Sequence, residues 1–177
     1  MRALILDCET TGLLESHTIK LANQPEVIEF YGVLVDLATG EQLKELDQLI
    51  KPKHPVSAEI TKITSITNEM LKDAPPFSEV ASEIFSMIEE APLVIAHNAS
   101  YDIEMLAIEA ERLGRMVSFP RVVCTVEATI HRKGFRLSLS ALYEDLFREQ
   151  FVGAHRAKVD VRALARICVE LNRQGEI

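Results

Sequence analysis

The chain has 177 residues, close to the size of one ordinary domain and long enough to bury a full core without disulfides or structural metals, so we expect a single domain over residues 1–177. Its three cysteines lack ligand-like spacing, which argues against a structural zinc site. No window approaches the roughly 18 apolar residues of a membrane span, which argues against a membrane partner. We therefore expect a cytoplasmic protein. The formal charge of −8 counts against a protein that tracks long nucleic acid through phosphate contacts alone.

The first part of the chain is predicted to form strands. An apolar strand at Ala3–Leu6 runs into the sequence Leu-Asp-Cys-Glu-Thr-Thr-Gly-Leu at 6–13. Apolar runs at 27–37 and 41–52 flank an Ala-Thr-Gly turn, so we expect an antiparallel hairpin beside the first strand.

Helices and short strands then follow one another. The expected elements are helices at 57–64, 67–71 and 77–91, a strand at 92–98, a helix at 100–113, a strand at 121–126, and helices at 138–147 and 159–171. Strands first and then alternating helices and strands predict the α/β class: a mixed central sheet with an antiparallel hairpin, flanked by helices.

Two carboxylates end the first strand. Side chains alternate faces along a strand, so Asp7 and Glu9 point the same way and Cys8 points into the opposite layer. Two like charges that lie close together raise the pKa of one of the two carboxyl groups unless a positive charge lies between them. We therefore expect either a cation between Asp7 and Glu9 or an exposed surface.

Two further aspartates begin helices on the same face as the apolar stripe. Asp102 leads Met105 and Leu106, and Asp160 leads Leu164 and Ile167. Each one alone is explained as readily by capping of the helix. Together with the acids of the strand, they fall at the edges where an α/β sheet places its ligand crevice.

His155 lies five residues before Asp160, about 140° away around a helix, so the two share a face only if Gly153 keeps His155 on the loop before the helix. A histidine on that loop can reach over the acids. His97, at the end of a buried strand, is more typical of a histidine satisfied within the core.

With these residues assembled, the sequence resembles the DEDDh group of 3′-to-5′ exonucleases, the proofreading-subunit and RNase T-like branch of the ribonuclease H-like fold. Three motifs carry the resemblance in order: Leu-Asp-Cys-Glu-Thr-Thr-Gly-Leu, Val-Ile-Ala-His-Asn-Ala-Ser-Tyr-Asp ending at Asp102, and His-Arg-Ala-Lys-Val-Asp at 155–160. Thr64 and Ser65 stand where the family usually has His-Gly before Ile-Thr.

The resemblance implies a catalytic set of Asp7, Glu9, Asp102, His155 and Asp160. The four acids would bind two Mg²⁺ or Mn²⁺ ions, with Asp7 bridging both, Glu9 and Asp160 completing one site, and Asp102 holding the other. Carboxylates suit hard cations, and two such ions would stabilise both the attacking and the leaving oxygens. His155 would take the proton from the attacking water.

The resemblance also implies the contacts to the substrate. The residues expected to bind the terminal nucleotide are Thr10, Thr11, Gly12, Ile66, Asn98 and Tyr101. Gly12 would allow a close backbone approach, Ile66 would pack on a base, and Tyr101 would offer a stacking face. Ordinary core packing explains Tyr101 equally well.

The function implied is release of 5′-mononucleotides from 3′ ends of single-stranded or frayed nucleic acid, with DNA favoured, by a single exonuclease domain. Two alternatives stay open: an RNA-processing 3′ exoribonuclease of the same fold, and a non-catalytic domain that binds a nucleic-acid end or a partner. The expected partners are 3′ ends of DNA or RNA, with a DNA polymerase or another replication or repair protein as a candidate.

Overall fold

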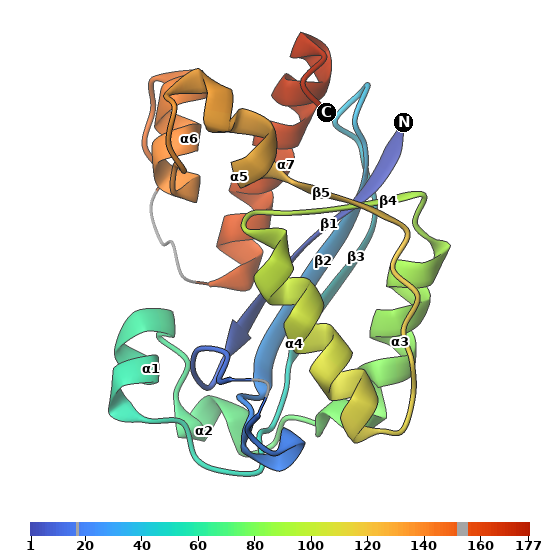
Figure 1. Ribbon diagram of the computed structural model, residues 1–177, viewed down its shortest axis with the longest axis vertical. Coiled ribbons are helices and arrows are strands. Elements are labelled where there is room, and N and C mark those ends of the chain that lie inside the picture. Colours follow the sequence, from blue (N-terminus) through green and yellow to red (C-terminus); the bar gives the residue numbers. More distant parts are fainter. Residues whose placement is uncertain (17, 152–155) are drawn as a thin grey trace.

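The computed structural model describes residues 1–16, 18–151 and 156–177. Its centre is a five-stranded sheet with strand order β3-β2-β1-β4-β5 (Figure 1). The strands are β1 (Arg2–Thr10), β2 (Val27–Asp36), β3 (Gln42–Leu49), β4 (Leu93–Ala96) and β5 (Arg121–Cys124). β1, β2 and β3 pair antiparallel, whereas β4 is parallel to both β1 and β5. The predicted mixed sheet with its hairpin is confirmed.

Helices cover both faces of this sheet. They are α1 (Ala58–Thr64), α2 (Asn68–Leu71), α3 (Phe77–Glu90), α4 (Ala99–Arg112), α5 (Thr125–Thr129), α6 (Leu139–Phe147) and α7 (Ala157–Gln174), with 3₁₀ turns η1 (Leu21–Asn23) and η2 (Ile130–Arg132). Within the described ranges, no helix is both long and apolar enough to cross a lipid bilayer.

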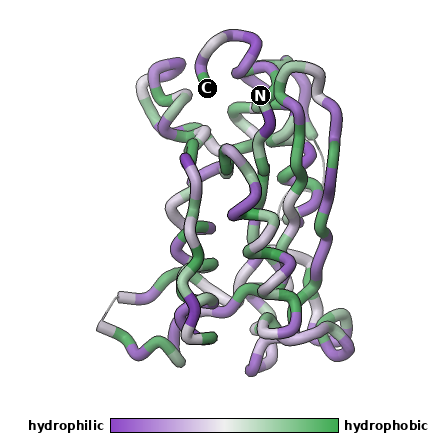
Figure 2. Tube along the Cα trace, turned by 90° about the vertical axis from the view of Figure 1, so that its right-hand side faces the viewer, coloured by the Kyte–Doolittle hydropathy of each residue, from purple (hydrophilic) through white to green (hydrophobic). Residues whose placement is uncertain are grey.

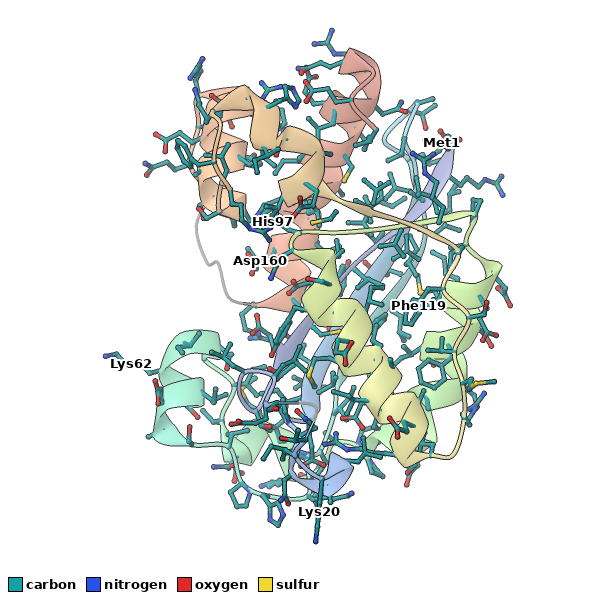
Figure 3. All side chains as sticks on the ribbon, in the orientation of Figure 1. Met1, Lys20, Lys62, His97, Phe119 and Asp160 are labelled. Carbon is teal, nitrogen blue, oxygen red and sulfur yellow. The ribbon has the colours of Figure 1, made fainter. Side chains whose placement is uncertain are left out.

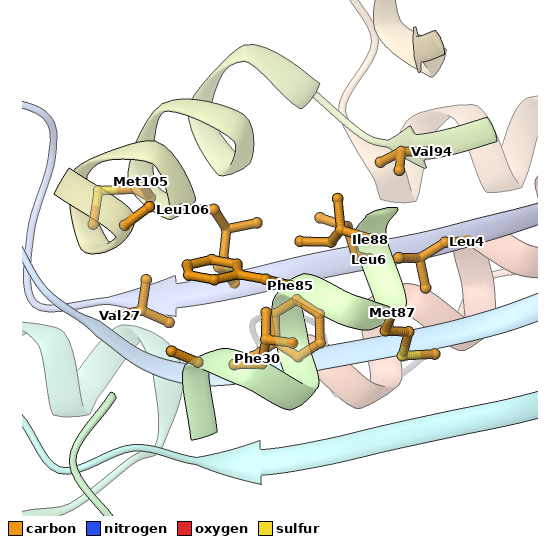
Figure 4. Packing of buried hydrophobic residues seen from close by; sticks show 14 of the residues in the cluster. Leu4, Leu6, Val27, Phe30, Phe85, Met87, Ile88, Val94, Met105 and Leu106 are labelled. Atoms are coloured by element: carbon orange, nitrogen blue, oxygen red, sulfur yellow. The ribbon is translucent and has the colours of Figure 1, made fainter. Parts of the chain in front are cut away.

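The alternation along β1 divides the core into two layers. Leu4, Leu6 and Cys8 pack with α3 and α4 on one face, as the close view of that layer shows (Figure 4). Ala3 and Ile5 pack on the other face, against α6 and α7. The hydropathy-coloured trace shows hydrophobic and hydrophilic residues interspersed along the chain (Figure 2). Asp7 and Glu9 continue the second alternation, so β1 directs both toward the α7 side.

Three differences from the predicted elements have local causes. β5 is shorter than expected because the chain turns into α5 at Thr125, whose hydroxyl approaches His97 Nδ1 at 2.9 Å. The turn η2 extends α5 without any apolar periodicity that would predict it. α7 begins at Ala157, earlier than the expected residue 159, because the Glu29 carboxylate accepts the Ala157 N–H at 2.9 Å.

Candidate active site

Three carboxylates from two elements meet at the end of β1. Asp7 and Glu9 come from the strand, and Asp160 comes from the first turn of α7, where Figure 3 labels it. One oxygen from each lies within 4.8 Å of the other two. The sheet alternation and the helix stripe therefore bring these three predicted residues together.

The crowding of these acids shifts their protonation. Burial, followed by the charges of Asp160 and Glu29, raises the pKa of Asp7 to about 7. Burial, followed by the charge of Asp7, raises the pKa of Glu9 to about 8. A cation among the oxygens would reverse this destabilisation, and an all-carboxylate donor set suits a hard divalent ion. The residues present therefore fit a divalent metal.

This crowding predicts the pH dependence of stability without metal. The pKa values of Asp7 and Glu9 in the fold lie above their ordinary values of 3.8 and 4.5, so the native state holds protons that the unfolded chain releases. In EDTA, stability should therefore fall as the pH rises from about 4 to 8. Melting temperatures across this range test it, and added Mg²⁺ should raise the melting temperature most at pH 8. A rise in stability with pH in EDTA would contradict the assignment.

Asp102 connects α4 to β1 next to the three acids. Its side chain is 2% exposed, and its Oδ1 accepts the Cys8 N–H at 2.9 Å. Burial, with the charge of Asp7 second, raises its pKa well above the ordinary range. Asp102 is close enough to Asp7 for the charge of Asp7 to raise its pKa. Among the described residues, it is not part of the cluster formed by the oxygens of the three other acids.

An ion pair between a buried glutamate and a partly exposed arginine holds the start of α7. The sequence analysis does not predict this pair. Glu29 pairs with Glu9 in the β1–β2 register and is fully buried. Its carboxylate accepts from Arg156 Nη2 at 2.6 Å and from the Ala157 N–H. Arg156 also lowers the pKa of Glu9. A glutamate at an inward position of the apolar run 27–37 was the available signal.

Glu29→Gln should destabilise the fold by about 1–3 kcal/mol, because it weakens hydrogen bonds at a buried group while Arg156 remains partly solvated. Urea unfolding measures this loss. Glu149→Gln is the matched control: Glu149 pairs with Arg166 at the exposed surface, so its removal should change the stability much less than Glu29→Gln does. Equal stability of the two variants would show that the buried pair does not hold α7.

His155 and Gly153 lie outside the described residues. The first described residue after them, Arg156, precedes α7 in extended conformation. The role expected of His155 therefore stays a prediction.

A cavity of about 530 Å³ opens beside the carboxylates, between the end of β1 and α1. Glu9, Thr10, Thr11, Gly12 and Tyr101 line it, and so do Ile60, Ile63 and Thr64 from α1. The Tyr101 hydroxyl donates to the Gly12 carbonyl at 2.7 Å and contacts Thr10 Oγ1. Tyr101 also packs against the core layer under α4, so it lies both at the core and at the cavity.

The prediction that Ile66 packs on a base is wrong for this structure. Ile66 is fully buried with Ile28, Val56 and Leu71 in a small cluster. Ser65, in the left-handed region at φ 61°, ends α1 and turns the following chain inward. Ile63, 48% exposed, and Ile60 present the apolar surface that was expected of Ile66.

Asn98 and His97 form the turn from β4 into α4. Asn98 is exposed at φ 65°, lines a second cavity of about 570 Å³ with Tyr101, and accepts from Arg136 Nη2 at 2.7 Å. His97 Nε2 donates to the Leu137 carbonyl at 3.1 Å. Burial lowers the pKa of His97 to about 4. Both ring nitrogens of His97 have a partner, which confirms the interpretation of His97 as a satisfied core histidine.

Known proteins are similar to this chain in sequence and in fold. The RNase T family profile, described as exonuclease, matches residues 4–168. DNA polymerase III PolC-type from Caldanaerobacter subterraneus is 30% identical over 95% of this chain, and that from Staphylococcus aureus is 31% identical over 97%. The chain spans 11% of the length of each of these relatives.

Solved structures agree on the fold. Exonuclease X in complex with 5′ overhanging duplex DNA has a TM-score of 0.70 at 24% identity, covering 98% of this chain and 93% of that one. The nuclease domain of 3′hExo, a DEDDh family member bound to rAMP, has a TM-score of 0.78 at 19% identity, covering 98% and 92%. The predicted resemblance is confirmed: with a profile match that extends over nearly all of its length, the chain belongs to the RNase T family of exonucleases.

Proposed function

We propose that residues 1–177 form a single exonuclease domain that releases 5′-mononucleotides from 3′ ends of single-stranded or frayed nucleic acid, with DNA favoured. The observation that carries this proposal is the group of three carboxylates at the end of β1, with oxygens within 4.8 Å of one another, beside a cavity lined by Glu9. A phosphate of a bound strand end needs a cation there, because the acids alone would repel it.

Exonucleases of this group generally use divalent metal ions, and the carboxylate cluster fits them. The proposed ions are two Mg²⁺ or Mn²⁺. Asp7, Glu9 and Asp160 would hold one, and Asp7 and Asp102 the other. Bound ions would supply charge stabilisation of the attacking and leaving oxygens.

The other residues would position the strand end and move the proton. Thr10, Thr11 and Gly12 line the cavity, and Tyr101 holds this turn in place through the Gly12 carbonyl. A base would lie against Ile60 and Ile63 of α1. Asn98 would contact the terminal nucleotide, and His155 would accept the proton of the attacking water.

The preference for DNA rests on the sequence relatives, which are named as DNA polymerases. One structural neighbour is titled as recognising a histone mRNA stem-loop, so an exoribonuclease remains the second candidate. The same relatives favour a DNA polymerase as the partner. A non-catalytic binding domain is the less favoured alternative, because all the acids of the motifs are present.

The test is digestion of 5′-labelled DNA and RNA oligonucleotides, single-stranded and duplex, with Mg²⁺ and with EDTA. We expect 5′-mononucleotides and a ladder that shortens from the 3′ end, only with metal and faster on DNA. Faster digestion of RNA would select the second candidate. Absence of cleavage on every substrate would reject the nuclease.

A further inference from the structure

The segment His-Arg-Lys-Gly-Phe-Arg at 131–136 combines cationic side chains with an aromatic ring, and the proposed function gives none of these residues a role. Phe135 is 59% exposed, and the side chains of Lys133 and Arg136 are 44% and 54% exposed. Gly134, at φ 77°, donates its N–H to the Ile130 carbonyl and closes the turn that leaves Phe135 outside. An aromatic ring between two cations therefore stands on the surface.

This segment is tied to the turn that leads into α4. Arg136 Nη2 donates to Asn98 Oδ1 at 2.7 Å, and His97 Nε2 donates to the Leu137 carbonyl at 3.1 Å. The Leu137 side chain is buried in the core layer under α6 and α7. Phe135 is thus held two residues from an anchored position, next to the turn that begins the helix carrying Asp102.

The charge of the chain is divided unequally around this segment. Residues 113–177 carry 11 Lys and Arg against 7 Asp and Glu, a net charge of +4. Residues 1–112 carry 8 against 20, a net charge of −12. The overall charge of −8 therefore conceals a cationic part, to which α5, α6 and α7 belong.

The local ion pairs leave these cations available. Lys133 pairs with Asp145 at 2.9 Å, but Arg132 also pairs with Asp145, so Asp145 stays neutralised without Lys133. Arg136 pairs with Glu127, and both side chains are more than half exposed. The Arg136–Glu127 pair is solvated and therefore weak, so a phosphate can replace Glu127. Lys133 is 44% exposed, and Asp145, 11% exposed, keeps Arg132 as a partner when Lys133 contacts a phosphate.

We infer that the loop 133–137 binds the nucleic-acid strand upstream of the scissile bond, with Phe135 stacking on a base and Lys133 and Arg136 contacting phosphates. Exposed aromatics with flanking cations are the means by which proteins hold single strands without sequence preference. This inference rests on the proposed function, which places the 3′-terminal nucleotide in the cavity between β1 and α1. In Figure 1, α1 lies at the lower left and the α5–α6 segment at the upper left, with the start of α7 between them in the view.

Binding to oligonucleotides of two lengths tests Phe135. The probes would be fluorescein-labelled dT2 and dT8, measured with Mg²⁺ at fixed salt. Their last linkage would be a phosphorothioate, so that binding is measured without cleavage. Phe135→Ala should weaken binding of dT8 about 10-fold, since one base–aromatic stack is lost, and that of dT2 by less than about 2-fold. Met116→Ala, which removes a 96% exposed side chain from a different loop, is the matched control and should change neither affinity.

The salt dependence tests Lys133. Lys133→Gln should reduce the slope of log affinity against log salt for dT8 by about 0.7, the value for one phosphate contact on a single strand. Lys44→Gln, on exposed β3, changes the net charge equally and should leave the slope unaltered.

Unchanged dT8 affinity in Phe135→Ala, or equal losses for dT2 and dT8, would overturn the inference. The proposed function is judged separately by release of nucleotides from unmodified dT8. Tight, Phe135-dependent binding without release would reject the nuclease and keep the loop as a strand-binding site.

Discussion

Asp7→Ala should abolish nucleotide release, by at least about 10³-fold, because Asp7 is the one acid proposed to serve both ions and several kcal/mol of charge stabilisation would be lost with it. Its position supports this role: burial, followed by the charges of Asp160 and Glu29, raises its pKa, and its own charge adds to the effect of burial in raising the pKa values of Glu9 and Asp102. The measurement is the initial rate on a 5′-labelled oligonucleotide at saturating Mg²⁺.

Asp7→Asn separates loss of chemistry from loss of the fold. The amide keeps the size of the carboxylate and removes a charge that the metal-free site disfavours, since the pKa of Asp7 is raised to about 7. In EDTA at pH 8 this variant should melt at a higher temperature than the wild type while being equally inactive with Mg²⁺. Asp73→Asn, an exposed acid beyond α2, is the control and should leave both quantities unchanged. Full activity of Asp7→Ala, or of the wild type in excess EDTA, would refute the metal assignment.

Periodicity predicted the parts of the molecule that depend on burial. The period-2 alternation of β1 placed Asp7 and Glu9 together and Cys8 in the opposite layer, and the stripe of α7 placed Asp160 beside them. These positions follow because a strand or helix with one apolar face has only one orientation against a core.

Long-range polar contacts could not be predicted in the same way. The Glu29–Arg156 pair joins residues 127 apart, and the Arg136–Asn98 bond joins residues 38 apart. The periodicity of apolar residues does not predict which inward-facing acid pairs with which cationic side chain. Ile66 was misplaced for a local reason, since Ser65 adopts the left-handed conformation without being a glycine or asparagine, the residues that usually signal it.

His155→Ala should leave folding and metal binding largely intact and slow turnover by about 10² to 10⁴, the usual contribution of a positioned general base. The start of α7 is held by the pairing of Arg156 with Glu29, and neither of these residues is changed in this variant. Circular dichroism and the rise in melting temperature with Mg²⁺ check that the variant is folded and binds metal.

The pH profile shows whether His155 acts as the base. At saturating Mg²⁺, bound ions would hold Asp7 and Glu9 deprotonated, so their raised metal-free pKa values would not shape the profile. The wild-type rate should then rise with pH through the titration of a histidine, and His155→Ala should lack that rise. His54→Ala removes an exposed histidine that is not part of the three-carboxylate cluster, and this variant should keep the wild-type profile. If the variant at position 155 retains the same titration, another group accepts the proton and His155 is not the base.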